Sequence, residues 1–453
     1  MDNSLREKDV TTHLHPQTNF RRHEEVGPLI IEGGDGVRVT DSAGRAYIEG
    51  VSGLWCAALG FSNKRLADAA HAQLCRLPYQ QTFAHRSNPA VIELAEALVE
   101  RAPGELARAM FQCSGSEAVD TAIKTSWYYH AARGKPEKRK VISRQGSYHG
   151  TTIASASLTG LPNMHRGFGI PLEGFIHVSR PHFWRGAQEG ETERAFSERL
   201  IAEIEAVIER EGADTIGAFF AEPVMGTGGV VLPPEGYFEL LQPLLKKHDI
   251  LFVVDEVICG FGRTGHYWGS DFAGLSPDMM TCAKGLSASY FPISALTITD
   301  EIYQVLADRS AEFGAFGHGF TYGGHPVGAA VALETLRIYD EIDIVAKARA
   351  RQDQLQQGLR ALADHPNVGE VRGVGMMAAI EFVQNRQTKA PFANPGKFGA
   401  RVSEDLARQG ILLRALGDTL VFAPPLIISE GELSEILDAV HVTLGRTEDI
   451  EAA

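Results

Sequence analysis

Asp255 and Lys284 are the two residues of this chain whose types and positions best suit catalysis. Asp255 follows the apolar run 250–254, Ile-Leu-Phe-Val-Val, which is typical of a buried strand, so its carboxylate is expected at the carboxyl end of that strand. A buried carboxylate is unfavourable unless it meets a cation or a strong hydrogen-bond donor. Lys284 follows a second apolar stretch downstream. A lysine in such a place is a candidate for covalent chemistry with a carbonyl group.

Together the two residues match the fixed points of a pyridoxal phosphate (PLP) site. A lysine amine forms an imine with the aldehyde of PLP, and an aspartate keeps the pyridine nitrogen protonated. Each residue also has an ordinary explanation when it is taken alone. Asp255 could cap a loop at a strand end, and Lys284 could be a surface lysine.

Composition and charge limit the class of protein. The chain has 453 residues, which is too long for one ordinary core, so two domains are expected. Its hydrophobic content of 44% and charged content of 22% are typical of globular proteins. The formal net charge of -14 argues against a nucleic-acid partner, because phosphate backbones attract clustered lysine and arginine. No stretch approaches the length of a membrane span, and the first twenty residues contain no apolar signal-peptide core.

The cysteines indicate a reducing compartment. They are few for a chain of this length, odd in number, and lack the spacing of a metal site. This usage favours free thiols and a cytoplasmic location over disulfides or zinc, and we predict no metal site. The cysteines are Cys56, Cys75, Cys113, Cys259 and Cys282.

Three segments with different patterns make up the chain. Residues 1–62 begin with a polar stretch, expected to be an irregular arm to about residue 28, and continue with short strands. Residues 63–329 alternate helical and apolar strand segments. Such alternation predicts an α/β large domain, with a mostly parallel sheet covered by helices on both faces. Residues 330–453 contain helices and short strands, and we expect them to complete a discontinuous α+β small domain with the first segment.

The candidate strands of the large domain deliver polar residues to one crevice. Ligands of open α/β sheets lie outside the carboxyl ends of the strands. A single binding site explains polar residues at the ends of all five strands better than five unrelated coincidences do. The expected strands are 109–111, 141–143, 215–220, 251–254 and 279–282, and the residues that follow them include Ser114 to Ala118, Gly146 to Gly150, Glu222, Asp255 and Lys284.

The stretch Ser114-Gly115-Ser116 is a candidate phosphate site. It leads directly into a helix expected to run to Ala132. The free amides and the positive end of the dipole at a helix start suit a phosphate, and Ser116 can add a hydroxyl donor. Ser114 and Glu117 also have the spacing of a capping box, so an ordinary helix cap is the alternative.

Three further residues could contact the cofactor. Tyr148 could lie flat over the pyridine ring, although packing is the commoner use of a buried tyrosine. Val257 could press on the opposite face of the ring or belong to the core. Glu222 could anchor a hydrogen bond in the site or be a solvated strand end.

Four stretches resemble class III aminotransferases, which are fold-type I PLP enzymes. The second of them consists of Asp-Glu-Val, two further residues and then Gly-Phe-Gly-Arg-Thr-Gly. Together with a lysine downstream, this motif is highly specific for the family. The likeness extends from about Asp41 to Pro425. The stretches are 114–118, 255–265, 283–285 and 320–326.

The resemblance implies a role for each site residue. Lys284 would bind PLP covalently, Asp255 would pair with the pyridine nitrogen, and Tyr148 would stack on the ring. Ser116 and the amide of Gly115 would bind the phosphate. The expected cofactor-binding residues are Ser114, Gly115, Ser116, Tyr148, His149, Glu222, Asp255, Val257, Lys284, Phe320 and Thr321.

The resemblance also implies an oligomer. Thr321 would bind the phosphate in the site of a neighbouring subunit. A homodimer with two shared sites is therefore the smallest expected oligomer, and a tetramer is the alternative.

Within class III the chain is most similar to ω-transaminases that use pyruvate with amines or β-amino acids. Residues 52–56 resemble their entrance motif, which makes Trp55 a wall of the substrate pocket, together with Tyr148. Residues 413–418 resemble the segment that carries their mobile arginine, so Arg414 would clamp the carboxylate of a keto acid. Without the resemblance, a surface ion pair is the simpler explanation for Arg414.

Three positions differ from other branches of the family. Thr151 stands where glutamate-linked members usually carry arginine, and Ile258 stands where many of them have glutamine. Both differences weaken a preference for 2-oxoglutarate. Thr227 is larger than the alanine of some ω-transaminases and would narrow the small pocket.

We therefore expect an aminotransferase with a ping-pong mechanism through pyridoxamine phosphate. It would move an amino group from a primary amine or an ω- or β-amino acid to a keto acid, with pyruvate as the expected acceptor. Lys284 would serve as general base and then general acid. The alternatives are a PLP aminomutase or decarboxylase on the same scaffold, or a non-catalytic PLP-binding protein.

Overall fold

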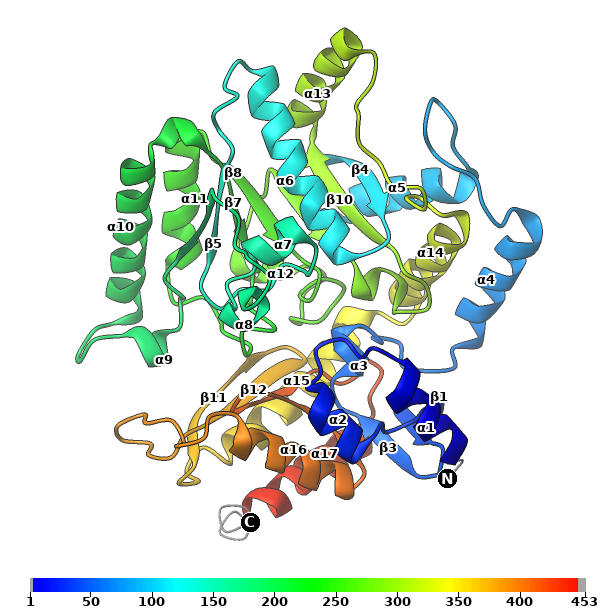
Figure 1. The fold of residues 1–453 in the computed structure, drawn as a ribbon, viewed down its shortest axis with the longest axis vertical. Coiled ribbons are helices and arrows are strands. Elements are labelled where there is room, and N and C mark those ends of the chain that lie inside the picture. The colour runs from blue at the N-terminus through cyan, green and yellow to red at the C-terminus, as the bar shows by residue number, and fades with distance from the viewer. Residues whose placement is uncertain (1–2, 447–453) are drawn as a thin grey trace.

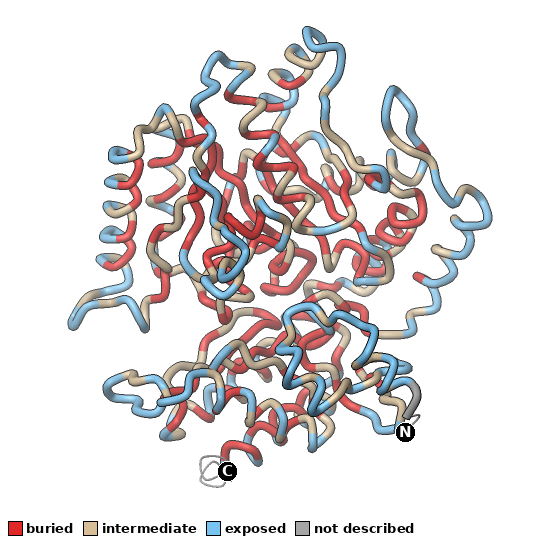
Figure 2. The backbone as a smooth tube through the Cα atoms, viewed as in Figure 1, coloured by how far each residue is buried: buried red, intermediate tan, exposed pale blue. Residues whose placement is uncertain are grey.

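The chain forms a large and a small lobe. A computed structural model describes residues 3–446. Figure 1 shows the large lobe around a central sheet, and below it a smaller lobe in which the first and last parts of the chain lie together. The buried backbone concentrates in the central strands and in the small lobe directly beneath them (Figure 2). Within residues 3–446 no helix is long and apolar enough to cross a membrane.

Within the described residues, the large lobe is built on a seven-stranded sheet with the order β4-β10-β9-β8-β7-β5-β6. β10 runs antiparallel to both of its neighbours, and the other pairs are parallel. The strands are β4 (Leu106–Gln112), β5 (Lys140–Arg144), β6 (Phe175–Val178), β7 (Ile216–Ala221), β8 (Leu251–Asp255), β9 (Met279–Cys282) and β10 (Ser294–Thr299).

Helices cover both faces of this sheet. Along β8, Phe252 and Val254 pack into one hydrophobic core, whereas Leu251 and Val253 pack into another. A strand covered on both faces has no solvated side, which explains its continuous apolar sequence. The α/β fold class is thereby confirmed. The helices of this lobe are α4 (Lys64–Arg76), α5 (Pro89–Arg101), α6 (Gly115–Ala132), α7 (Ile153–Leu158), α8 (Pro162–His165), α9 (Phe183–Gly186), α10 (Glu193–Glu211), η1 (Ala213–Thr215), α11 (Tyr237–Lys247), α12 (Gly269–Ala273), η2 (Lys284–Ser287), α13 (Asp300–Phe313) and α14 (Pro326–Glu341).

All five strands predicted for the large lobe are confirmed, within a few residues at their ends. β6 and β10 were not predicted. β6 is only four residues long and half-buried in its middle, and β10 contains three serine or threonine residues. Neither has the apolar run that marks the buried parallel strands.

Two four-stranded sheets form the small lobe, with the orders β1-β2-β3-β13 and β11-β12-β15-β14. β13 pairs in parallel with β3 and sets Ile411 opposite Ile48, which joins the two ends of the chain in one sheet. The strands are β1 (Ile31–Asp35), β2 (Arg38–Asp41), β3 (Ala46–Glu49), β11 (Val368–Val374), β12 (Met377–Phe382), β13 (Ile411–Leu412), β14 (Arg414–Leu416) and β15 (Thr419–Phe422), and the helices are α3 (Ser52–Trp55), α15 (Ile344–Arg360), α16 (Lys397–Arg408) and α17 (Glu430–Leu444).

The domain boundaries at 62/63 and 329/330 stay a prediction. The second boundary falls inside α14, which packs against α4 and α5 of the large lobe.

The prediction of an irregular arm to about residue 28 is wrong for most of that segment. The arm contains α1 (Asn3–Thr12) and α2 (Phe20–Val26). Asn19 caps α2, since its side chain accepts a hydrogen bond from the amide of Arg22. Neither helix buries an apolar stripe, and without such a stripe the sequence carries no periodic helix signal.

Arg263 and Gly375 join the two lobes. Arg263 is buried, and its guanidinium Nη1 donates to the carbonyls of Met376 (2.9 Å) and Pro424 (2.7 Å). Burial lowers the pKa of Arg263 to about 10. Gly375 has a φ of 55°, and a Cβ added there would lie 2.3 Å from the carbonyl carbon of Thr264. The loop after β8 therefore meets the small lobe without space for a side chain.

We predict that Gly375→Ala destabilises the protein by about 2 kcal/mol or more, because it adds a backbone clash to an unfavourable left-handed conformation. Gly431→Ala is the matched control. Gly431 lies in α17 with nothing within 4 Å of an added Cβ, so alanine there should be neutral or slightly stabilising. Melting temperatures of the two variants check this prediction, and equal values would contradict it.

Candidate active site

A cavity of about 140 Å³ opens at the carboxyl ends of the parallel strands. It is the place where open α/β sheets bind ligands. The structure brings most of the predicted residues to it. Those that line the cavity are Gly115, Ser116, Tyr148, His149, Glu222, Asp255, Val257 and Lys284.

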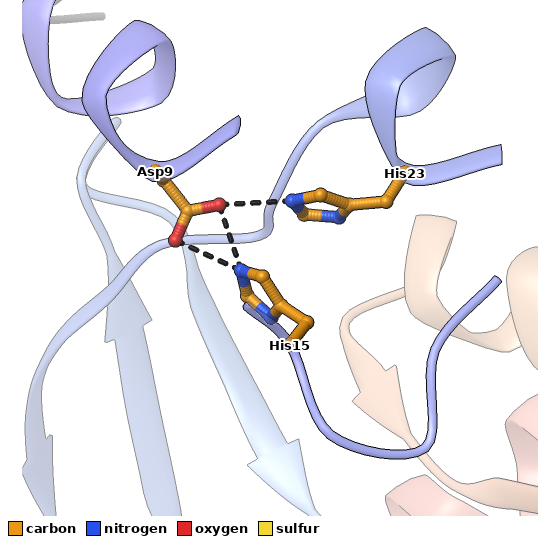
Figure 3. A group of neighbouring side chains, drawn as sticks. All are labelled: Asp9, His15 and His23. Carbon is orange, nitrogen blue, oxygen red and sulfur yellow. Dashed lines mark hydrogen bonds and ion pairs between the residues drawn. The ribbon is translucent and has the colours of Figure 1, made fainter. Parts of the chain in front are cut away.

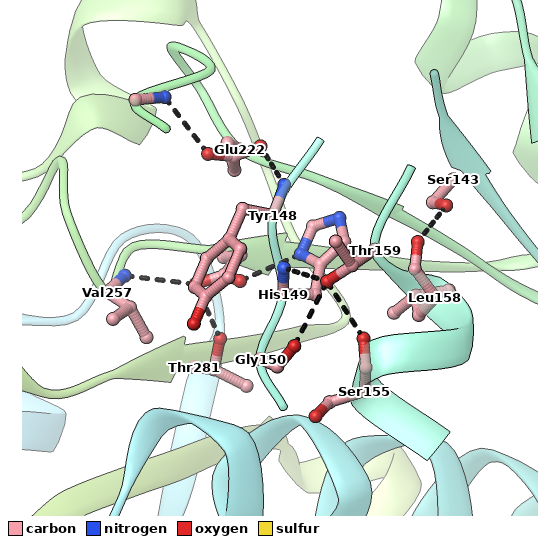
Figure 4. A network of polar contacts seen from close by, with 12 residues as sticks. Ser143, Tyr148, His149, Gly150, Ser155, Leu158, Thr159, Glu222, Val257 and Thr281 are labelled. Carbon is pink, nitrogen blue, oxygen red and sulfur yellow. Dashed lines mark hydrogen bonds and ion pairs between the residues drawn. The ribbon is translucent and has the colours of Figure 1, made fainter. Parts of the chain in front are cut away.

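Asp255 is held rigidly at the end of β8. Only 4% of the residue is exposed, and its Oδ2 lies 2.8 Å from Nδ1 of His149. Its Oδ1 accepts hydrogen bonds from the amide of Val257 (3.1 Å) and from Oγ1 of Thr281 (3.2 Å) (Figure 4). Thr281 pairs directly with Asp255 across β8 and β9. These donors stabilise a buried carboxylate and fix its orientation.

His149 is the neighbour of Asp255 that the residue pattern alone could not identify. The strand pattern placed it in the crevice with residues 146–150, and the family resemblance made it a cofactor-binding residue, but neither named Asp255 as its partner. Its amide donates to Oγ1 of Thr159 at 2.9 Å, and its ring lies beside Phe220. His149 and Asp255 come from different strand ends, so only the folded sheet shows that they pair.

Glu222 is a buried anchor and not a solvated strand end. Only 3% of it is exposed, and burial raises the pKa of its carboxyl group. Its two oxygens accept from the amides of Tyr148 (3.2 Å) and Gly226 (3.0 Å). Figure 4 shows the Tyr148 ring extending from this anchored backbone. Glu222 thus positions the loop that presents the aromatic ring to the cavity.

The start of α6 forms the opposite end of the cavity. Ser114 does not line it, because its side chain caps the helix in a capping box with Glu117. Ser116 Oγ accepts from the amide of Thr151 at 3.0 Å, which leaves its own proton to donate to a ligand. A Cβ at Gly115 would lie 3.2 Å from both methyl groups of Val257. A larger residue there would crowd Val257 at this end of the cavity.

Lys284 lies at the start of η2 on a wall that two cavities share. Its φ of 44° is unusual for a lysine, and such outliers persist where the surrounding structure over-determines them. Burial lowers the pKa of its amine. Across residues 3–446 no hydrogen bond or ion pair engages the amine. A larger neutral fraction and a free lone pair favour attack on an aldehyde.

A second, larger cavity of about 780 Å³ adjoins the first. Tyr148 and Lys284 border both cavities, and Trp55, Thr227 and Arg414 line the outer one. Burial lowers the pKa of Arg414, which has no ion-pair partner in the part of the chain that the structure describes. A surface ion pair is therefore not the explanation for Arg414.

The inner cavity fits PLP in shape and in chemistry. Tyr148 and Val257 can flank a flat ring, and Asp255 offers a fixed negative charge for a ring nitrogen. The amides at the start of α6 and the hydroxyl of Ser116 suit a phosphate. Lys284 borders the same space with its amine.

The family model of aminotransferase class-III matches residues 20–444. The chain is a class III aminotransferase. It is therefore a PLP-dependent enzyme of fold type I that transfers amino groups. The predictions of family, fold class and cofactor are confirmed.

Curated relatives of this aminotransferase match nearly its whole length. It is 44% identical to gamma aminobutyrate transaminase 1, mitochondrial, from Solanum lycopersicum, over 96% of this chain and 85% of the relative. It is also 44% identical to vanillin aminotransferase of Capsicum frutescens, over 94% of this chain and 93% of that protein.

Solved structures agree in fold. The omega transaminase from Pseudomonas jessenii in complex with PMP is 49% identical, with a TM-score of 0.97 over 98% of both chains. A transaminase with L-Ala is 50% identical, with a TM-score of 0.92 over 93% of this chain and 99% of the other.

Phe320 and Thr321 are not brought to the inner cavity of their own chain. Phe320 lines a separate cavity with Phe83 and Gly324, and Thr321 is exposed. The hydroxyl of Tyr79 donates to the carbonyl of Thr321 at 2.7 Å. The roles predicted for Phe320 and Thr321 therefore need a second subunit and stay predictions.

Sequence reasoning missed several residues of the site. The sequence predicts Thr281 only as part of a strand, and nothing in the sequence indicates that its hydroxyl binds Asp255. Arg180 and the arm residues Pro16 and Gln17 line the outer cavity, although neither segment has a recognisable motif. Arg180 follows β6, so recognition of that strand would have pointed to it.

We predict that Asp255→Asn still binds PLP but lowers kcat by about a hundredfold or more, because an amide cannot stabilise the positive charge on a ring nitrogen. Absorbance of bound cofactor and steady-state kinetics measure the two effects. Asp308→Asn, at an exposed position of α13, is the control that should change neither. Unaltered kcat in Asp255→Asn would contradict the role of this carboxylate.

Proposed function

We propose that this aminotransferase takes its amino group from a primary amine or an ω- or β-amino acid and passes it to pyruvate. The observation that carries the proposal is the unpaired guanidinium of Arg414 in the outer cavity, which Lys284 also borders. A guanidinium binds a carboxylate with two parallel hydrogen bonds. A keto acid held in this way would have its carbonyl group directed toward the inner cavity.

The charge balance of the outer cavity favours an acceptor with a single carboxylate. Arg180 also lines this cavity, but its guanidinium donates to the carbonyl of Gly228, and its neighbours Glu370 and Glu381 form ion pairs with Arg372. Within residues 3–446 the guanidinium of Arg414 has neither a hydrogen bond nor an ion pair, which leaves it free to bind one carboxylate. Pyruvate needs one cation, whereas 2-oxoglutarate needs two.

The relatives support the same pair of substrates. One solved relative is a transaminase with L-Ala, and alanine is the amino counterpart of pyruvate. Others are omega transaminases. The side chains of Trp55 and Thr227 narrow the outer cavity. The enzyme would therefore select its amine mainly by size.

The residues of the site divide the work of transfer. Bound PLP supplies an electron sink for the carbon that loses its proton. Lys284, at the junction of the two cavities, takes that proton with its neutral amine and later returns one as an acid. Asp255 keeps the ring nitrogen charged, and the buried His149 holds that carboxylate in place.

We also propose a homodimer in which Phe320 and Thr321 complete the partner's site. Support comes from the exposure of Thr321 and from the exposed aromatic residues around it, Tyr79, Phe83 and Tyr322.

The five cysteines are all free, which supports a cytoplasmic location.

We predict that Lys284→Ala abolishes turnover, because no other amine of the inner cavity can carry the proton. Lys246→Ala, on the exposed side of α11, is the matched control and should keep wild-type rates. A spectroscopic assay with amine and pyruvate measures both. Turnover by Lys284→Ala at the wild-type rate would refute the assignment, and product formed without any keto acid would favour an aminomutase or decarboxylase.

We predict that Arg414→Gln lowers kcat/KM for pyruvate by roughly 10- to 100-fold, the value of a charged hydrogen-bonded pair, and leaves the half-reaction with an amine that lacks a carboxylate nearly unchanged. Arg408→Gln, at an exposed position of α16, should change neither. Single-turnover absorbance with each substrate separates the two half-reactions. Equal losses for both substrates would show that Arg414 does not bind the carboxylate.

A further inference from the structure

Three side chains of the N-terminal arm converge on one point (Figure 3). Asp9 comes from α1, His15 from the loop after it, and His23 from α2. Oδ1 of Asp9 lies 2.9 Å from Nε2 of both histidines. The two imidazole rings are tilted against each other, with their centroids 4.1 Å apart. All three side chains are only partly accessible to solvent.

A third histidine adds to the cluster. Nδ1 of His13 lies 3.4 Å from Oδ2 of Asp9, and its ring centroid is 4.1 Å from that of His15. Three imidazoles thus surround one carboxylate. One carboxylate and several imidazole nitrogens are thus gathered at one point, which is the donor set of many metal sites.

The arrangement suits a divalent cation. Imidazole nitrogens and carboxylate oxygens bind Zn²⁺ at about 2.0–2.2 Å. The ligand atoms of Asp9, His15 and His23 lie within 4.8 Å of one another, so small side-chain movements bring them all to such distances. Imidazole with carboxylate is a donor set that suits zinc and similar transition metals.

We propose that Asp9, His15 and His23 form a binding site for a divalent transition metal ion, with Zn²⁺ as the best-suited ion. His13, whose Nδ1 lies 3.4 Å from Oδ2 of Asp9, stands beside these three residues. The expectation of no metal site rested on the number and spacing of the cysteines. Asp9, His15 and His23 meet only when the arm folds into two helices.

The site connects to the substrate cavity through the chain itself. Pro16 and Gln17 directly follow His15 and line the outer cavity. The side-chain amide of Gln17 donates to Sδ of Met164, another residue of that wall, at 3.2 Å. A metal ion that ties α1, His15 and α2 together would hold these two residues at the cavity wall.

The test is a zinc titration of the PLP-loaded enzyme against a chromogenic chelator. Cys75→Ser serves as the background, because Cys75 lies 3.8 Å from His71 and could bind zinc by itself. We expect one tight site per chain. His15→Gln with His23→Gln should weaken it by more than roughly a hundredfold, since even changes behind the ligands cost about 10- to 100-fold.

His71→Gln in the same background is the matched control and should leave the tight site intact. No tight site in the background protein, or equal affinity after loss of His15 and His23, would overturn the proposal. Trypsin gives a second readout at Arg21 and Arg22 in α2. Zinc should slow cleavage there in the background protein and not in the double variant, and equal protection in both would also overturn the proposal.

Discussion

A buried negative charge at the end of β8 is the constraint on which the site depends. Asp255 is almost fully enclosed, and a carboxylate in that position is stable only when donors surround it. His149, Thr281 and the amide of Val257 provide them from three segments of the chain. The same contacts fix the direction of the charge, so a ring nitrogen would meet it in one orientation. The hydrogen bonds that hold the Asp255 carboxylate thus stabilise the fold and also orient the charge in the site.

The parallel sheet brings the remaining groups within reach of that charge. Because parallel strands end at one edge, the loops after β5, β7, β8 and β9 share one space. Glu222 ties the Tyr148 loop to the end of β7 by a hydrogen bond to its backbone. The arrangement of the site therefore depends mainly on where the sheet places the backbone of these loops.

Substrate selection depends on how the two lobes meet. Trp55 and Arg414 belong to the small lobe, yet they line the outer cavity with Tyr148 and Lys284 of the large lobe. Arg263 links the lobes through carbonyls at the ends of small-lobe strands. A shift of one lobe would therefore move Arg414 relative to Lys284. The shared residues Tyr148 and Lys284 couple the inner cavity to the outer one.

The sequence by itself determined the α/β class, five central strands, the placement of Asp255 at a strand end, and the capping box at Ser114. These features depend on local patterns: apolar runs, strand ends and cap spacing. Only the tertiary structure decided that His149 meets Asp255, that Arg414 lacks an anionic partner among residues 3–446, and that the polar arm folds into helices around Asp9. Each of these depends on residues far apart in the chain or on burial, and no local pattern records which side chains the fold brings together.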